Sequence, residues 1–310
     1  MAGDFSTLYW EITSDCNLRC KHCSQPHHNK NYYELGEAKK IVDIIVEYGT
    51  ERIMFLGGEP ILYPWIFEII EYAKKKNLVT CMSSNGTLLG SEEIKALKEV
   101  GLDHLQISID GLEKTHDKIR GRGTFAKAQK ALSLAKNAGI HTYAKFTLLE
   151  DNADETIDVV LDCYKKGISC DVGLGIPVGS FSSKPISPEK YFTIFTYLFQ
   201  LKKKLNLKNF LPDFSLEEFL EKGYASSLCP AGRGIFALTI DRKLSPCPFY
   251  SPIENFLPAF EPKLEKVLES RIFKLFRENN TFICLTRYFA QGKDHYSVYE
   301  FVRWKNNNSV

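Results

Sequence analysis

Three cysteines near the start of the chain have a spacing that suits a metal cluster. Cys16, Cys20 and Cys23 form a Cys-x3-Cys-x2-Cys pattern within one short loop. A [4Fe-4S] cluster contains four irons that are normally ligated by four cysteines, so three thiolates leave one iron open to another ligand. Open metal positions are typical of sites that carry out chemistry, as zinc enzymes illustrate. The spacing therefore predicts a cluster with one accessible iron.

The cysteine loop taken alone also allows other interpretations. Zinc sites combine cysteines a few residues apart with further cysteines or histidines, and His27 and His28 follow the third cysteine closely. Three unrelated thiols are the remaining alternative. These residues favour an iron-sulfur cluster and leave zinc open.

Two polar motifs follow the cysteine loop, and each comes after an apolar, strand-like run. The first is Gly57, Gly58, Glu59 and Pro60, and the second begins with Ser84 and Asn85. Glycine allows a close backbone approach, and the Glu59 carboxylate can accept hydrogen bonds from an ammonium group. A Gly-Gly pair by itself indicates only a turn. Its place after a strand and downstream of the cysteines makes it a candidate ligand-binding segment.

With these motifs the sequence resembles the radical S-adenosylmethionine (radical SAM) enzymes. In that family the amino and carboxylate groups of SAM chelate the open iron, and the reduced cluster cleaves SAM to a 5'-deoxyadenosyl radical that abstracts hydrogen from substrate. The resemblance implies a SAM-binding [4Fe-4S] cluster, SAM, and an external electron donor such as flavodoxin or ferredoxin. It also implies that the Gly57 to Pro60 segment binds the SAM amino group.

The stretch from Ser108 to Phe125 extends the resemblance to the branch that modifies peptides or builds cofactors. By that resemblance Ser108 contacts the SAM ribose or carboxylate, and Arg120 contacts the carboxylate. The plain structural alternatives are a strand-end hydroxyl for Ser108 and a solvated helix arginine for Arg120.

Two more residues have the same double interpretation. Asn85, with Ser84, either contacts SAM or makes an Asx turn with Gly86. His22 lies where the family tends to have an aromatic residue near the adenine, and its alternative is a packed loop side chain.

Composition narrows the possible partners. The chain has 40 basic and 38 acidic residues among 310, a net charge of +2, which favours neither nucleic acid nor a membrane surface as a partner. No apolar run approaches the roughly 20 residues needed to cross a bilayer, and the short polar start is not a signal peptide. We therefore expect a cytoplasmic protein, in which the nine cysteines are metal ligands or buried thiols rather than disulfides.

The elements expected to position these motifs alternate between strands and helices. Ile41, Ile44, Ile45 and Tyr48 follow the spacing of a buried helical stripe. The pattern predicts an α/β fold, a partial (β/α)6 TIM-like barrel, in which the motifs meet at the carboxyl ends of the strands. The six expected strands are 8–13, 52–56, 79–83, 104–109, 141–148 and 170–176.

A Pro, Gly and Ser-rich segment, 176–185, separates this region from the rest of the chain and is a linker or an active-site loop. We expect a radical SAM barrel over 1–180 and a smaller α+β domain over 181–310. A helix is expected at 188–205. After it, residues 232–244 have the pattern of a hairpin with its turn near 241–243.

Cys229 and Cys247 flank that hairpin and can share a metal centre, with Cys284 as a third ligand. The layout resembles the SPASM and twitch domains that hold auxiliary clusters, although a full SPASM domain uses about seven cysteines. The resemblance implies one auxiliary [4Fe-4S] cluster, whose fourth ligand could be substrate, solvent or a side chain such as His295. The alternative is three buried thiols without metal.

The sequence thus favours a radical SAM enzyme that modifies a ribosomally made peptide by oxidation, crosslinking or epimerisation. A small molecule or cofactor precursor, such as an alcohol or a tetrapyrrole, is the second substrate class. A non-catalytic iron-sulfur or zinc protein is the alternative of a different kind, and it has no use for the Gly57 to Pro60 segment.

Overall fold

The structure is a computed structural model of the 310-residue chain. It describes residues 6–25, 30–176, 179–184, 186–205 and 234–249, together with the short stretches 257–258, 269–270 and 273–274. None of the helices in this part of the chain is long and apolar enough to span a membrane.

The first half of the described chain alternates strands with helices. Its elements are β1 (Thr7–Thr13), α1 (Leu35–Glu47), β2 (Arg52–Gly57), η1 (Pro60–Leu62), α2 (Ile66–Lys75), β3 (Val79–Ser84), α3 (Ser91–Glu99) and β4 (His104–Ser108). They are followed by α4 (Glu113–Arg120), α5 (Thr124–Asn137), β5 (His141–Leu148), η2 (Glu150–Glu155), α6 (Thr156–Lys165) and β6 (Ser169–Leu174). The remaining elements are α7 (Pro188–Leu205), β7 (Ile235–Leu238), β8 (Lys243–Ser245) and β9 (Leu257–Pro258).

The apolar pattern of the sequence explains these elements. Alternate residues of β1 are fully buried, namely Leu8, Trp10 and Ile12, which is the two-residue period of a strand. In α1, Ile41 and Ile45 are buried a turn apart, as one face of an amphipathic helix requires. The six strands predicted from the sequence are confirmed, with ends that differ by at most two residues.

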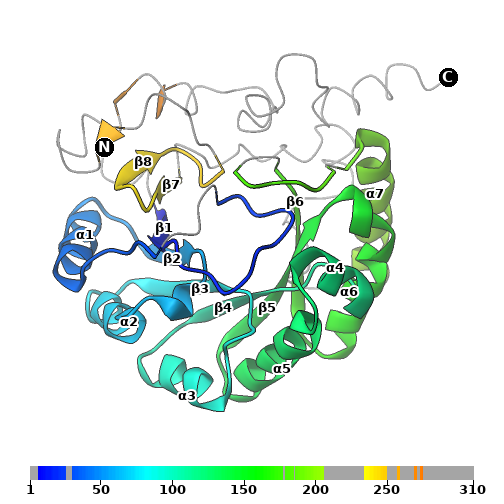
Figure 1. Ribbon diagram of the computed structural model, residues 1–310, viewed down its shortest axis with the longest axis horizontal. Coiled ribbons are helices and arrows are strands. Elements are labelled where there is room, and N and C mark those ends of the chain that lie inside the picture. Colours follow the sequence, from blue (N-terminus) through cyan, green and yellow to red (C-terminus); the bar gives the residue numbers. More distant parts are fainter. Residues whose placement is uncertain are drawn as a thin grey trace.

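Six parallel strands run through the sheet in the order in which they occur along the chain. The order is β6-β5-β4-β3-β2-β1-β7-β8-β9, and every neighbouring pair from β1 to β6 is parallel. Figure 1 shows the sheet curving, with α1, α2, α3, α5 and α6 on its outer side. Because all six strands point the same way, the segments that follow them meet at one edge of the sheet.

The predicted hairpin is present, and it extends this same sheet. β7 and β8 are antiparallel, while β7 lies parallel to β1. Thr7 donates its backbone N–H to the Gly234 carbonyl at 3.0 Å. This pairing satisfies the hydrogen-bonding groups on the side of β1 that faces away from β2.

The segment 179–184 lies against the cysteine loop. Ser180 donates its hydroxyl to the carbonyl of Gln25 at 2.7 Å, and the Ser182 hydroxyl donates to the carbonyl of Lys21 at 2.9 Å. The helix α7 that follows has the predicted bounds, and it is joined to η2 by the ion pair of Lys190 with Glu150 at 3.5 Å. The described part of this segment therefore packs against the loop that carries the cysteines.

Candidate active site

The cysteine loop begins directly after β1 and presents three free thiols. Cys16, Cys20 and Cys23 are each half-buried. The backbone of Cys23 donates to the carbonyl of Cys20 at 3.2 Å, which forms a tight turn between the second and third cysteines. Burial raises the pKa of the Cys16 thiol to about 11, so metal binding at this thiol would release a proton.

Gly57 and Gly58 pack the end of β2 onto the cysteine loop. Gly58 donates its N–H to the Thr13 carbonyl at 2.8 Å, and Glu59 donates to the Asp15 carbonyl at 2.7 Å. A Cβ atom on Gly57 would lie 2.1 Å from the Thr13 oxygen, and one on Gly58 would lie 2.2 Å from the Asp15 oxygen. The close approach that these glycines permit is therefore an approach to the loop that carries the cysteines.

We expect Gly58→Ala to destabilise the protein by about 1–3 kcal/mol, because overpacking here meets backbone that cannot turn aside. Gly36→Ala is the control, since a Cβ on Gly36 meets nothing within 4 Å and alanine is the better helix former. Urea unfolding of the metal-free protein measures both changes. Equal stability of the two variants would contradict this account of Gly58.

Glu59 connects the end of β2 to the end of β3. Its side chain is fully buried, one carboxylate oxygen accepts from the Ser84 hydroxyl at 2.7 Å, and the other accepts from the Asn85 N–H at 2.7 Å. Burial raises the pKa of Glu59 to about 7, although the hydrogen bonds from Asn85, Ser84 and the Ile61 backbone act in the opposite direction. A carboxylate has about four acceptor sites and these three hydrogen bonds use three of them, so the group keeps capacity for an ammonium ligand.

This shifted pKa predicts a pH dependence of the metal-free protein. Between the ordinary pKa of 4.5 and about 7, the unfolded chain loses the Glu59 proton and the folded chain keeps it. Stability should therefore fall as pH rises through this window, by about 3 kcal/mol from this group.

Unfolding free energies of wild type, Glu59→Gln and Glu68→Gln between pH 4 and pH 8 test that prediction. The Glu59→Gln protein should lose this part of the fall, whereas Glu68→Gln changes an exposed carboxylate on α2 and should follow the wild type. A wild-type slope that survives in Glu59→Gln would assign the titration to another group.

Asn85 binds the cysteine loop with its side-chain amide. It donates to the Asn17 side-chain oxygen at 2.9 Å, while its own oxygen accepts from the Thr87 N–H at 2.8 Å. The second contact is an Asx turn around Gly86, whose φ of 76° suits glycine. The Asx turn expected as the alternative role of Asn85 is thus present. The same side chain also holds the loop between Cys16 and Cys20.

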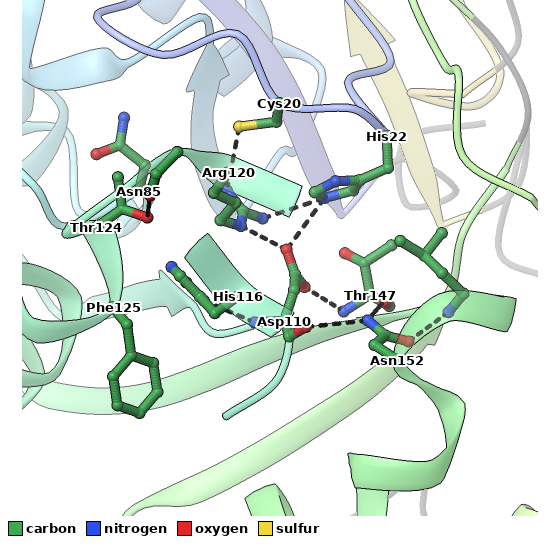
Figure 2. Close-up of polar contacts among 12 residues, drawn as sticks. Cys20, His22, Asn85, Asp110, His116, Arg120, Thr124, Phe125, Thr147 and Asn152 are labelled. Atoms are coloured by element: carbon green, nitrogen blue, oxygen red, sulfur yellow. Dashed lines mark hydrogen bonds and ion pairs between the residues drawn. The ribbon is translucent and has the colours of Figure 1, made fainter. Parts of the chain in front are cut away.

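Arg120 and His22 meet in a buried cluster beside Cys20 (Figure 2). The Arg120 guanidinium donates through Nε to Asp110, and its Nη1 lies 3.9 Å from the Cys20 sulfur. His22 Nε2 lies 3.1 Å from the Asp110 carboxylate. The Arg120 side chain is only 10% exposed, so it is not the solvated helix arginine that was one alternative.

Asp110 is the centre of this cluster. The sequence places it with Ser108 at the end of the fourth strand but assigns it no role. Besides Arg120 and His22, its carboxylate accepts the Thr147 N–H of β5 at 2.8 Å. Burial opposes the charge, but Arg120 and His22 lower the pKa of Asp110 well below its usual range. Its position two residues after β4, beside Gly111, was the available signal.

Ser108 lies half-buried at the end of β4, in register with Lys145 of β5. Cys247 is buried after β8, where its carbonyl accepts from the Ser245 hydroxyl at 2.8 Å. The other residues predicted to bind metal, or weighed as ligands, lie outside the described residues: His27, His28, Cys229, Cys284 and His295.

The donor set of the cysteine loop fits a [4Fe-4S] cluster, which is normally held by cysteine thiolates. Among the described residues, no three His, Cys, Asp or Glu side chains converge as a single ion would require. The cysteines of a [4Fe-4S] cluster stand farther apart than the ligands of a single ion, because each thiolate ligates a different iron of the same cluster. Three thiols on one loop, held from several strand ends, therefore suit a cluster with one further position.

Comparison with known proteins identifies the family of this chain. The family described as the radical SAM superfamily matches residues 10–177, more than half of the chain. An AdoMet-dependent heme synthase of Nitratidesulfovibrio vulgaris is 31% identical over 209 residues, which are 64% of this chain and 57% of that protein. The sporulation killing factor maturation protein SkfB of Bacillus subtilis is 27% identical over 245 residues, 76% of this chain and 58% of SkfB. The chain spans about half the length of the curated relatives it matches.

Solved structures share the fold. The structure of native anSMEcpe with bound AdoMet aligns with a TM-score of 0.72 at 21% identity, covering 88% of this chain and 82% of that one. Streptococcus suis SuiB bound to its precursor peptide SuiA aligns with a TM-score of 0.70 at 14% identity, covering 90% and 66%. At these identities the likeness concerns the fold alone. The family match over residues 10–177 identifies the chain, which belongs to the radical SAM superfamily.

Proposed function

We propose that this protein cleaves SAM reductively and uses the product radical to abstract a hydrogen atom from its substrate. The observation that carries the proposal is the loop with Cys16, Cys20 and Cys23, which is held by residues after β2, β3 and β4. The three thiols would hold three irons of a [4Fe-4S] cluster and leave the fourth for SAM. When bound, the cluster and SAM supply the radical chemistry, and the chain's own residues bind, orient and shield them.

The residues proposed to hold SAM lie at the ends of the parallel strands. Gly57 to Pro60 would present backbone groups and the Glu59 carboxylate to the SAM ammonium. Because Glu59 is fully buried, solvent would screen the attraction between its carboxylate and the ammonium only weakly. Ser84 and Asn85 would act mainly by keeping Glu59 and the cysteine loop in place, given their observed hydrogen bonds. Ser108 is proposed to contact the ribose or carboxylate.

The direct test is anaerobic reconstitution with iron and sulfide, followed by incubation with SAM and dithionite. We expect about four irons per chain at this site and formation of 5'-deoxyadenosine. A reconstituted protein that forms no 5'-deoxyadenosine contradicts the catalytic proposal. Binding of one zinc in place of iron would support the non-catalytic alternative.

The region 181–310 is proposed to hold an auxiliary [4Fe-4S] cluster of the SPASM or twitch type. Supporting this, Cys247 directly follows the observed hairpin of β7 and β8. Cys229 and Cys284 would complete the set. About eight irons per chain, rather than about four, is the expected result, and Cys247→Ala should lower the count by up to four while 5'-deoxyadenosine still forms.

The favoured substrate is a ribosomally made peptide, in line with the likeness of the Ser108 to Phe125 stretch to peptide maturases. The alignment with the maturation protein SkfB supports it, because it extends over 76% of the chain. The proposal includes a partial barrel whose open side admits the substrate. The electron donor would be a flavodoxin or ferredoxin, and the protein would be cytoplasmic.

A tetrapyrrole is the second candidate substrate, because relatives more identical to this chain than SkfB are named as heme or porphyrin synthases. They include AdoMet-dependent heme synthases at 30 to 31% identity and an Fe-coproporphyrin III synthase of Methanosarcina barkeri at 36% over 163 residues. Titration with Fe-coproporphyrin III, followed by its visible absorption, tests this candidate. A mass change in a short peptide encoded beside the gene, after coexpression, tests the first. If the protein binds the porphyrin and leaves the peptide mass unchanged, a tetrapyrrole becomes the favoured substrate in place of a peptide.

A further inference from the structure

The C-terminal end of α4 is attached to the cysteine loop by both backbone and side chain. Lys21 donates its backbone N–H to the Ile119 carbonyl at 3.0 Å. Arg120, the last residue of the helix, then extends its side chain toward Cys20 and His22 (Figure 2). Three successive loop residues thus contact two successive residues of α4.

The orientation of the Arg120 guanidinium is fixed from three sides. Its Nε donates to the Asp110 carboxylate, Nη2 lies 3.2 Å from His22 Nε2, and Nη1 lies 3.9 Å from the Cys20 sulfur. Asp110 is itself fully buried and is held by the Thr147 N–H at 2.8 Å. A planar guanidinium paired in this way has little freedom to turn.

Net stability is a weak explanation for this arrangement. A buried ion pair contributes little net stability compared with apolar side chains of the same size, and Arg120 remains charged at any working pH. What the arrangement does achieve is a fixed guanidinium with an N–H donor directed at one cysteine of the predicted cluster. The Asp110 carboxylate acts on the Cys20 thiol in the opposite direction, but Arg120 lowers the pKa of that thiol more than Asp110 raises it.

We propose that Arg120 is a positioning residue for the cluster: its guanidinium, held by Asp110, donates a charge-assisted hydrogen bond to the Cys20 sulfur and raises the reduction potential of the cluster. The inference rests on the proposed function, because it requires that Cys20 ligates iron. It differs from the role implied by the family resemblance, in which Arg120 binds the SAM carboxylate.

The physical reason is the sign of the charge that reduction adds. One electron makes the cluster more negative, so a nearby cation and a hydrogen bond to a sulfur ligand stabilise the reduced state. Because Arg120 is only 10% exposed and Asp110 is 0% exposed, water screens this interaction weakly.

The test is the midpoint potential of the reconstituted protein without SAM, followed by EPR. The signal of the SAM-binding cluster is recognised because it changes when SAM is added. Arg120→Gln should lower the ratio of reduced to oxidised cluster at a fixed potential about tenfold, which is about 59 mV for one electron. Arg122→Gln, which removes an exposed arginine two residues away, should keep the wild-type potential.

Arg120→Met is the second neutral variant, since it keeps much of the side-chain volume, and Arg120→Lys retains the charge. Far-UV circular dichroism checks the fold of each. The lysine variant should show a smaller drop in potential than either neutral variant. The neutral variants could fold without assembling a cluster. In that case, cluster assembly in Arg120→Lys supports the proposal, and a lysine variant that assembles no cluster overturns it.

A wild-type potential in both neutral variants also overturns the inference, and weaker SAM binding by calorimetry would then return Arg120 to the SAM carboxylate. These outcomes are separate from failure of the proposed function. That failure would appear in the wild type, as a protein that assembles no cluster or forms no 5'-deoxyadenosine.

Discussion

Replacing Cys16, Cys20 and Cys23 with alanine should reduce 5'-deoxyadenosine formation to background and remove the iron that this loop binds. The three thiols are free, half-buried and carried by one loop, whereas the other free cysteines among the described residues, Cys81, Cys163, Cys170 and Cys247, are buried. Without thiolate ligands the irons have no anchor at the strand ends, and SAM has no metal to bind. Iron analysis, visible absorption and chromatography of the SAM products measure the effect.

The matched comparison is between single thiols. Cys20→Ala removes a predicted ligand, whereas Cys81→Ala removes a buried thiol from β3 that is 3% exposed and belongs to the core. We expect the first variant to lose SAM cleavage and the second to retain it at the wild-type level per assembled cluster. Cleavage that survives in the triple variant would mean that the site has been assigned to the wrong cysteines.

Asp110→Asn should have the largest effect on stability of any single change in the site, about 3–5 kcal/mol. The substitution leaves the Arg120 charge buried without its carboxylate, and breaking one side of a buried ion pair has a cost of this size. The carboxylate also accepts from Thr147 and lies 3.1 Å from His22. Urea unfolding of the metal-free protein measures the loss.

Asp162→Asn is the control, because Asp162 pairs with Lys166 on the surface of α6 at 2.6 Å with 37% of its side chain exposed. An exposed helical pair of this kind is worth about 0.5 kcal/mol or less. Equal losses in the two variants would show that the Asp110 cluster does not hold the cysteine loop to α4 and β5.

The pKa of Asp110 also predicts how its contribution depends on pH. The folded-state pKa is lowered below the ordinary value of 3.8, so the stabilisation is present above that value and is lost as pH falls toward the folded-state pKa. Wild-type stability should therefore decline in acid more steeply than that of Asp110→Asn. A parallel decline in both proteins would point to other carboxylates.

Much of the site could be predicted from the sequence because strand direction alone places the motifs. The two-residue apolar period of β1 and the helical stripe of α1 are local properties, and parallel strands bring the segments after them to one edge. The positions of Cys16, Gly57 and Asn85 at that edge follow from counting strands.

The contacts among these motifs could not be predicted, because they depend on distances between segments far apart in the chain. Glu59 binds the end of β3 across 26 residues, and Arg120 reaches Cys20 across 100. The pairing of β7 with β1 is also non-local, and the pattern of residues 235–238 gives no sign of which strand they join.

The sequence by itself thus determined the family to which this chain belongs and the edge of the sheet at which its motifs meet. Residue type and spacing are enough for that, since ligand identity and strand polarity are local. Only the tertiary structure decided that Asp110 is buried at the meeting point of β4, β5, α4 and the cysteine loop. Its role depends on burial, which makes an unpaired charge costly and a fixed one effective, and burial is a property of the whole fold.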